Sequence, residues 1–136
     1  MTGGTGIDYF IVPNGESGLS DSTADIITNF DDTVDKLQIG GSTTADATAT
    51  TGNYVEESAS VANFNVALSQ ANTALNTLNT GTGSSPTYIT SADLYSFQYD
   101  ANYGYLFTDT DSDGDADLVV MLTGINSTEI DASNIK

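Results

Sequence analysis

Five aspartates alternate with small residues in the run DTDSDGDAD, which spans residues 109–117. Calcium takes about six to eight oxygen ligands, and alternate residues of a tight loop can direct their oxygens to one point. Gly114 would permit the sharp turn that this convergence needs. Without a cation, carboxylates so close in sequence repel one another. The run therefore predicts a calcium site formed by the carboxylates of Asp109, Asp111 and Asp113, the backbone carbonyl of Asp115, and Asp117 bound directly or through water.

The aspartate loop differs from an EF-hand in its last ligand and in the elements that flank it. Its first six positions fit the EF-hand pattern and its ninth, Asp117, is acidic, but its twelfth is Val120 where an EF-hand carries a bidentate Glu. The flanking sequences also favour strands over helices. We therefore expect a hairpin-type calcium loop of modest affinity. The alternative interpretation is an ordinary hairpin turn at Asp113-Gly114 with solvated carboxylates.

A second motif, GGTGIDYF at residues 3–10, fits one unit of the glycine-rich nonapeptide repeat that binds calcium. The glycines of such a unit let carbonyls turn toward the ion, and Asp8 would supply a carboxylate. Two successive turns make a site, so Asp8 is expected to be half of one, completed by upstream repeats. A phosphate-binding glycine loop is the rival interpretation, but it requires a helix to follow, and a strand is expected instead.

The charge balance excludes several classes of partner. The chain of 136 residues has 15 Asp and 4 Glu against two cations, Lys36 and Lys136, for a net charge of −17. Binding to phosphate backbones and to anionic lipid surfaces depends on basic residues, so we expect neither nucleic acid nor an anionic membrane surface as a partner. No stretch of the sequence approaches the roughly 18 apolar residues needed to span a bilayer, so we also expect no membrane insertion. Self-repulsion at this charge destabilises a compact state unless cations offset it.

The residue types also limit the chemistry. The chain has no Cys and no His, which excludes thiol and imidazole catalysis and tetrahedral zinc sites made of Cys and His. Glycosidases need only two carboxylates, but no pair stands out among the 19 acids. We therefore predict that the protein is not an enzyme.

Strands are expected in the N-terminal zone, residues 1–40. Residues 9–12, 25–30 and 35–39 are rich in aromatic and β-branched side chains and are separated by turn residues. Residues 41–56 are rich in Thr, Ala, Ser and Gly and are expected to form a loop.

The hydrophobic period changes to that of a helix over residues 57–80. The apolar residues of this segment form a stripe along one face of the expected helix. A coiled-coil seam is one use of such a stripe, but its short length and uncharged flanks favour packing on a sheet. The apolar stripe consists of Val61, Phe64, Leu68, Ala71, Leu75 and Leu78.

The last zone, residues 87–136, is expected to form an antiparallel meander. Its strands cover residues 94–99, 103–108 and 118–122, with turns at Asp100 and in the aspartate loop. We predict one domain over residues 1–136, mainly β, with one long amphipathic helix packed on the sheet.

Three segments together resemble the end of an RTX β-roll and its C-terminal cap: residues 3–11, 24–30 and 34–39. The last hairpin, residues 105–124, is similar to that of serralysin-type and cyanobacterial surface-protein C-terminal domains. Asn29 stands where that family usually has Asp, and the helical segment is not part of its minimal cap. The resemblance implies the end of a β-roll, continuous with upstream β-roll repeats.

The resemblance also implies a location and a function. Export would proceed through a type I secretion apparatus, directed by an uncleaved C-terminal signal, and calcium would trigger folding outside the cell. The protein would then be extracellular or attached to the cell surface. The alternative function is a self-assembly or adhesion module of a surface layer, with calcium bridging neighbours. Its support is the exposed acids and a set of tyrosines, although tyrosines at alternating strand positions are more often half-buried sheet residues: Tyr88, Tyr95, Tyr99, Tyr103 and Tyr105.

Overall fold

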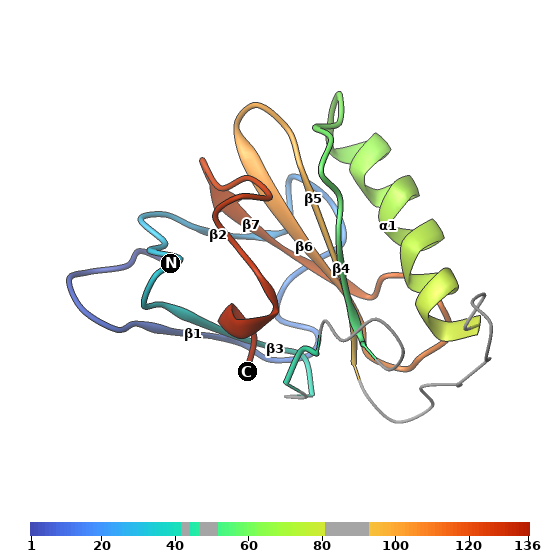
Figure 1. Cartoon of the computed structure of the whole chain (residues 1–136), viewed down its shortest axis with the longest axis horizontal. Coiled ribbons are helices and arrows are strands. Elements are labelled where there is room, and N and C mark those ends of the chain that lie inside the picture. Colours follow the sequence, from blue (N-terminus) through green and yellow to red (C-terminus); the bar gives the residue numbers. More distant parts are fainter. Residues whose placement is uncertain (42–43, 47–51, 81–92) are drawn as a thin grey trace.

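The computed structural model describes residues 1–41, 44–46, 52–80 and 93–136. Within these ranges the chain is mainly β, as predicted, with one helix packed on a sheet (Figure 1). The elements are β1 (Tyr9–Val12), β2 (Asp25–Ile27), β3 (Lys36–Ile39), β4 (Tyr54–Glu56), α1 (Phe64–Thr80), β5 (Leu94–Tyr99), β6 (Tyr103–Asp109), β7 (Leu118–Thr123) and the 3₁₀ helix η1 (Ala132–Asn134).

A five-stranded sheet in the order β2-β7-β6-β5-β4 forms the centre of the fold. The predicted meander is confirmed, because β5, β6 and β7 pair antiparallel. Asp100 makes the first turn: its N–H donates to the carbonyl of Tyr103 (2.9 Å), and its carboxylate accepts the hydroxyl of Tyr105. Burial opposes ionisation of Asp100, but this hydrogen bond and two backbone N–H donors outweigh it and lower the pKa of the carboxyl.

Helix α1 covers one face of this sheet and begins later than predicted. Residues 57–63 are not helical, because the N–H groups of Glu57 and Val61 donate to carbonyls of β5 (3.1 and 2.8 Å). Asn63 then caps the helix by accepting the N–H of Val66 (3.2 Å). Of the predicted stripe, three residues are buried and three are partly buried. The buried face consists of Phe64, Ala67, Ala71 and Leu75, with Val61, Leu68 and Leu78 at its margin.

The prediction of a continuous loop over residues 41–56 is wrong at its end. Tyr54–Glu56 forms β4, which pairs parallel with β5 at the sheet edge. Asn53 holds this strand in place through two hydrogen bonds. Its side-chain amide donates to the backbone carbonyl of Asp93 (2.8 Å), and its backbone carbonyl accepts the N–H of Tyr95 (2.8 Å). Tertiary pairing therefore forms a strand where the local composition favours a loop.

A second, two-stranded sheet pairs β1 with β3 in parallel. Its alternating inner residues, Phe10, Val12, Leu37 and Ile39, pack against the face of the large sheet opposite α1, in a core that includes Phe97 and Leu106. The strand predicted over residues 25–30 ends at Ile27, because Asn29 has a positive φ of 56° that an extended strand does not accommodate.

The two edges of the small sheet differ. The outer edge of β3 is closed by the C-terminal residues: Ile135 forms a bridge with Leu37, and the N–H of Lys136 donates to the carbonyl of Leu37 (2.8 Å). Asn134 adds a hydrogen bond to the carbonyl of Asp32 (2.7 Å). The outer edge of β1 has no neighbouring strand among the described residues.

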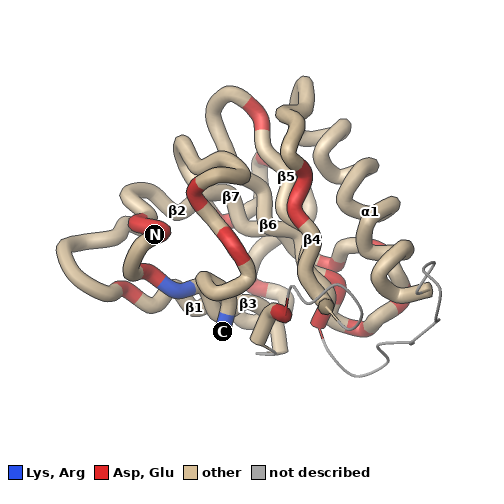
Figure 2. The backbone as a smooth tube through the Cα atoms, viewed as in Figure 1, with Lys and Arg blue, Asp and Glu red and all other residues tan. Residues whose placement is uncertain are grey.

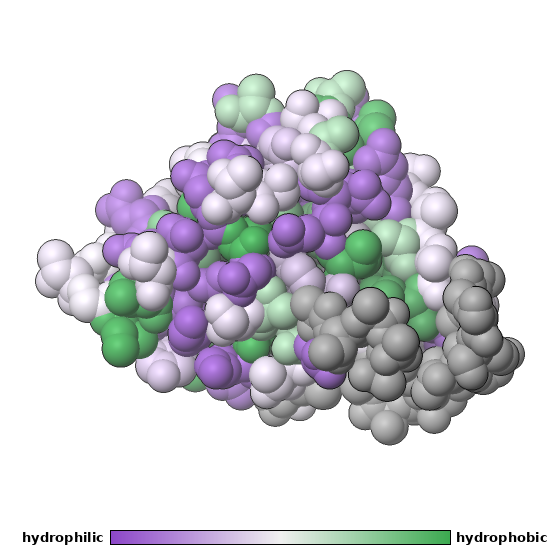
Figure 3. Space-filling model, viewed as in Figure 1, coloured by the Kyte–Doolittle hydropathy of each residue, from purple (hydrophilic) through white to green (hydrophobic). Residues whose placement is uncertain are grey.

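The outer face of β1 is apolar, and its free edge consists of backbone N–H and C=O groups. Hydrogen bonds to β3 use the carbonyls of Asp8 (2.9 Å) and Val12 (3.0 Å), and backbone groups of alternate strand residues point to opposite edges. The alternate residues Tyr9 and Ile11 therefore direct their backbone groups to the free edge. The space-filling view has an apolar patch over the start of this strand (Figure 3). The exposed fractions are 63% for Ile7, 63% for Tyr9 and 56% for Ile11.

The described tyrosines of the meander are buried or partly buried in the sheet. Tyr95 and Tyr105 are buried, and Tyr99 and Tyr103 are partly buried. Tyr88 lies outside the described residues. The assignment of residues 1–136 to one domain stays a prediction.

Candidate metal centre

The aspartate run forms the loop between β6 and β7. Asp109 is the last residue of β6, and the N–H of Asp117 donates to the carbonyl of Thr108 (2.9 Å), which closes the neck of the loop. The chain reverses through two residues with positive φ, Ser112 at 61° and Gly114 at 96°. The predicted role of Gly114 is thus confirmed, since this is the left-handed region that glycine tolerates best.

Asp109 is the anchor of the loop and is fully buried, with 0% of its surface exposed. One carboxylate oxygen accepts the N–H of Ser112 (2.6 Å) and the other accepts the N–H of Gly114 (2.8 Å). Burial is the main cause that raises the pKa of Asp109; these two hydrogen bonds oppose the rise, and the charges of Asp113 and Asp117 add to it. A buried carboxylate in an acidic loop is a group that a cation would stabilise.

Asp109, Asp111 and Asp117 each place one carboxylate oxygen within 4.8 Å of those of the other two. Calcium binds oxygens at about 2.3–2.6 Å, so two ligands on opposite sides of one ion lie up to about 5 Å apart. The three oxygens can therefore share a metal ion. Each carboxylate has about four lone-pair positions, so the hydrogen bonds that Asp109 already accepts leave room for a metal.

Thr110 holds Asp117 in this group. Its N–H and its hydroxyl both donate to the same carboxylate oxygen of Asp117, at 2.8 and 2.7 Å. Asp117, ninth in the loop, is thereby turned back toward Asp109 at the first position. This hydrogen-bonded pair explains how a residue eight positions along the chain joins the cluster.

The cluster of described residues does not include Asp113 or Asp115. Both are exposed, and the carboxylate of Asp113 accepts the N–H of Asp115 (2.9 Å). Their roles as ligands, including the backbone carbonyl of Asp115, stay predictions.

Asp8 also lies outside the cluster, at the start of β1. Its carboxylate accepts the N–H of Gly4 (2.6 Å) and its N–H donates to Asp35 (2.9 Å). The carboxylate thus closes a glycine-rich turn. Its role as half of a second calcium site stays a prediction.

Helix α1 supports the loop through two residues that the sequence analysis missed. The side-chain carbonyl of Asn72 accepts the N–H of Ala116 (3.0 Å). Asn76, one helical turn later, lies so close to Gly114 that an added Cβ would be 3.1 Å from its side-chain oxygen. The i, i+4 spacing of two polar residues on the helix is a signal for a shared face, but it does not indicate what that face contacts.

The two cations of the chain are distant from the loop in the fold. Lys36 lies in β3 and Lys136 bonds to the neighbouring Leu37, both on the side of the large sheet opposite α1 (Figure 2). Neither lysine is therefore placed to neutralise the acids that surround Asp109.

Comparison of the chain with protein-family models, with curated proteins and with solved structures found no match. No helix among the described residues has the length and apolar character needed to cross a membrane. The function of the protein is therefore inferred from its residues and their geometry.

Proposed function

We propose that this protein is a calcium-binding structural module and not an enzyme. The observation that carries the proposal is that Asp109, Asp111 and Asp117 each place one carboxylate oxygen within 4.8 Å of the other two. All three donors are carboxylate oxygens, which suit calcium, and the chain has no His or Cys to favour a softer metal. Magnesium demands a tighter octahedron and gives up its waters reluctantly, so it should substitute poorly.

Calcium would couple the folding of the module to its surroundings. A loop without the bidentate Glu of an EF-hand should bind with a dissociation constant on the order of 10⁻⁴–10⁻³ M, as extracellular modules do. Such a site would be empty at cytosolic calcium concentrations and filled outside the cell. The net charge of −17 would then keep the chain loosely folded for export through a type I secretion apparatus and allow it to become compact afterwards.

Isothermal titration calorimetry tests the calcium site. The double substitution Asp111→Asn and Asp117→Asn keeps the size of both side chains and removes two charges from the cluster, so we expect calcium affinity to fall at least about tenfold. The matched control, Glu16→Gln with Asp21→Asn, removes two charges from exposed positions outside the loop and should leave the affinity within about twofold. Equal losses in both double variants would contradict the proposal, because calcium would then respond only to total charge.

The open edge of β1 supports a role at the end of a β-roll. One edge of the small sheet is closed by Ile135 and Lys136, whereas the other has an apolar stripe and no neighbouring strand within the described part of the chain. A parallel strand from upstream repeats would extend this sheet and cover the exposed side chains of Tyr9 and Ile11. The module would thus terminate a β-roll of an exported, extracellular protein.

The free edge of β1 also leads us to predict how the isolated chain associates. An uncovered apolar edge strand tends to pair with another strand, so we expect weak, concentration-dependent association that calcium does not promote. Ile11→Lys places a charge in the stripe and should abolish this association in sedimentation velocity. Val66→Lys, at a 36% exposed apolar position on α1, is the matched control and should not.

The alternative function, a self-assembly or adhesion module of a surface layer, predicts a different result. Calcium would then bridge neighbouring molecules, so association would increase with calcium and would survive Ile11→Lys. That outcome would replace the β-roll end with the surface-layer module as the better proposal.

A further inference from the structure

We propose that the pocket between β4 and α1 binds an organic cation, an ammonium or guanidinium group carried on an apolar stem. The pocket has a volume of about 490 Å³, within the range of about 300–1,000 Å³ that is usual for small-molecule sites. It is separate from the aspartate loop. Its wall consists of Val55, Glu57, Ala59, Ser60, Gln70, Thr73, Ala74, Thr77 and Leu78.

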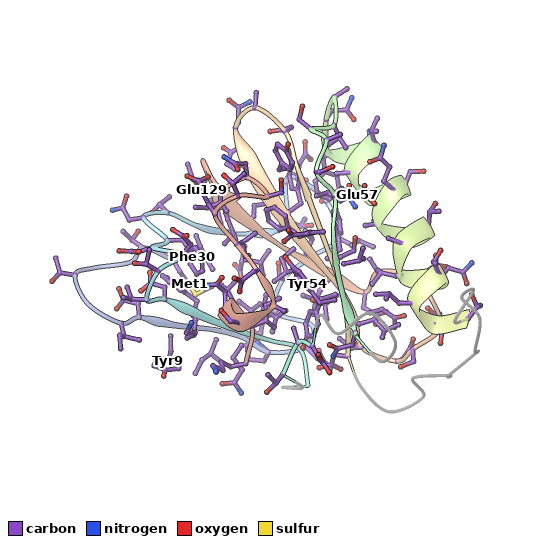
Figure 4. All side chains as sticks on the ribbon, viewed as in Figure 1. Met1, Tyr9, Phe30, Tyr54, Glu57 and Glu129 are labelled. Atoms are coloured by element: carbon purple, nitrogen blue, oxygen red, sulfur yellow. The ribbon has the colours of Figure 1, made fainter. Side chains whose placement is uncertain are left out.

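The wall combines one helix face with the segment that leaves β4. The helical residues follow the i, i+3, i+4, i+7, i+8 spacing of a single face. Aliphatic side chains from both elements, among them Val55 and Leu78, provide apolar surface for a methylene stem. The side-chain view labels Glu57 where the chain passes from β4 toward α1 (Figure 4).

The helical hydroxyls of this wall are acceptors. Thr73 donates its hydroxyl proton to the carbonyl of Ser69 (3.0 Å), and Thr77 donates its own to the carbonyl of Thr73 (2.8 Å). Because these protons are used within the helix, a ligand can reach only the oxygen lone pairs. These two oxygens therefore favour a ligand that donates hydrogen bonds.

Glu57 is the only charged side chain of the wall. It is half-buried, and its carboxylate has no hydrogen-bond or ion-pair partner among the described residues. No residue from 58 to 92 is charged, and Lys36 and Lys136 lie at the small sheet beyond the opposite face of the large sheet. Neither lysine is therefore placed beside this carboxylate, and the N-terminal ammonium donates to the carbonyl of Ile26 instead. A ligand cation would complement the carboxylate.

A single carboxylate among hydroxyls and aliphatic groups is a poor calcium site, because calcium needs several hard oxygens around one ion. An alkylammonium or guanidinium fits better, since its donors meet the carboxylate and the Thr oxygens while its stem lies on Val55 and Leu78. Free amines and the side chains of a Lys- or Arg-containing peptide share this chemistry.

Amide chemical-shift titration tests the proposal in about 150 mM salt and saturating calcium, which suppress non-specific attraction to the acidic chain. The probes are pentylammonium, N-acetyl-lysine methylamide and, as the neutral counterpart, N-acetyl-norleucine methylamide. We expect the two cations to shift the amides of Ala59, Ala74 and Leu78 and the neutral probe not to. Tighter binding of pentylammonium would identify a free amine as the ligand. Tighter binding of the lysine derivative would identify a peptide side chain.

Two substitutions separate the pocket from general charge effects. Glu57→Gln should weaken binding of both cations at least about fivefold. Glu56→Gln is the matched control: it removes the same charge one residue away, where the carboxylate accepts the hydroxyl of Tyr54 (2.9 Å) and does not line the pocket. Thr77→Val, isosteric at an exposed position, removes one acceptor and should weaken binding about twofold.

Three results would overturn the proposal: equal losses in the Glu57 and Glu56 variants, equal binding of the neutral probe, or shifts that map outside the pocket. None of these results bears on the calcium loop, so the two proposals fail independently.

Discussion

Replacing Asp109 with Ala should destabilise the protein more in calcium than without it. Without calcium, the buried N–H of Gly114 and the partly buried N–H of Ser112 lose their acceptor. Each unsatisfied donor costs about 1–3 kcal/mol, offset in part because a buried charge is also removed. We therefore expect the free energy of unfolding to fall by about 2 kcal/mol in chelator.

In saturating calcium the same variant should also lose the contribution of the bound ion. That contribution is about 2.7 kcal/mol at a hundredfold excess over the dissociation constant, so the total loss should reach about 4–5 kcal/mol. Urea unfolding in chelator and in calcium measures both values. A loss that is the same in the two conditions would mean that Asp109 supports only the loop backbone and contributes nothing to calcium binding.

Leu75→Ala should destabilise the fold by about 3 kcal/mol whether or not calcium is present. Leu75 is 0% exposed in the core between α1 and the large sheet. Leu-to-Ala changes at such sites cost about 2–5 kcal/mol, because transfer energy is lost and a cavity remains. The melting temperature should fall by roughly 10 °C.

The control for this change is Val66→Ala on the same helix, at a position that is 36% exposed. A surface truncation of this kind should stay within about 0.5 kcal/mol. If the two substitutions had equal effects, α1 would not be packed on the sheet through the face that contains Leu75.

The sequence predicts the elements whose pattern is local. The meander follows from three apolar runs separated by turn residues, and the packed face of α1 follows from the spacing of Phe64, Ala71 and Leu75. The first residue of α1 does not follow from this spacing, because the N–H groups of Glu57 and Val61 donate to carbonyls of β5. Strand β4 is missed for the same reason, since only its partner strand makes it extended.

In the candidate site, too, the features that depend on local sequence are predictable and those that depend on tertiary packing are not. Alternation along one short loop suffices to predict that Asp109 and Asp111 converge. The support from Asn72 and Asn76 cannot be predicted, because it depends on how a helix more than thirty residues earlier packs against the loop. The pocket beside Glu57 likewise arises only where β4 and α1 meet, and neither element indicates it alone.

The most direct test of the central claim is the melting temperature as a function of calcium, for the parent chain and for the variant with Asp111→Asn and Asp117→Asn. Between chelator and about a hundredfold excess of calcium, the melting temperature of the parent should rise by roughly 5–10 °C. Magnesium at the same concentration should give a much smaller rise, and calcium should raise the melting temperature of the double variant by at most about half as much as that of the parent. If the double variant gained the same stability from calcium as the parent, the aspartate loop would not be the calcium site, and an ordinary hairpin turn with solvated acids would be the better interpretation.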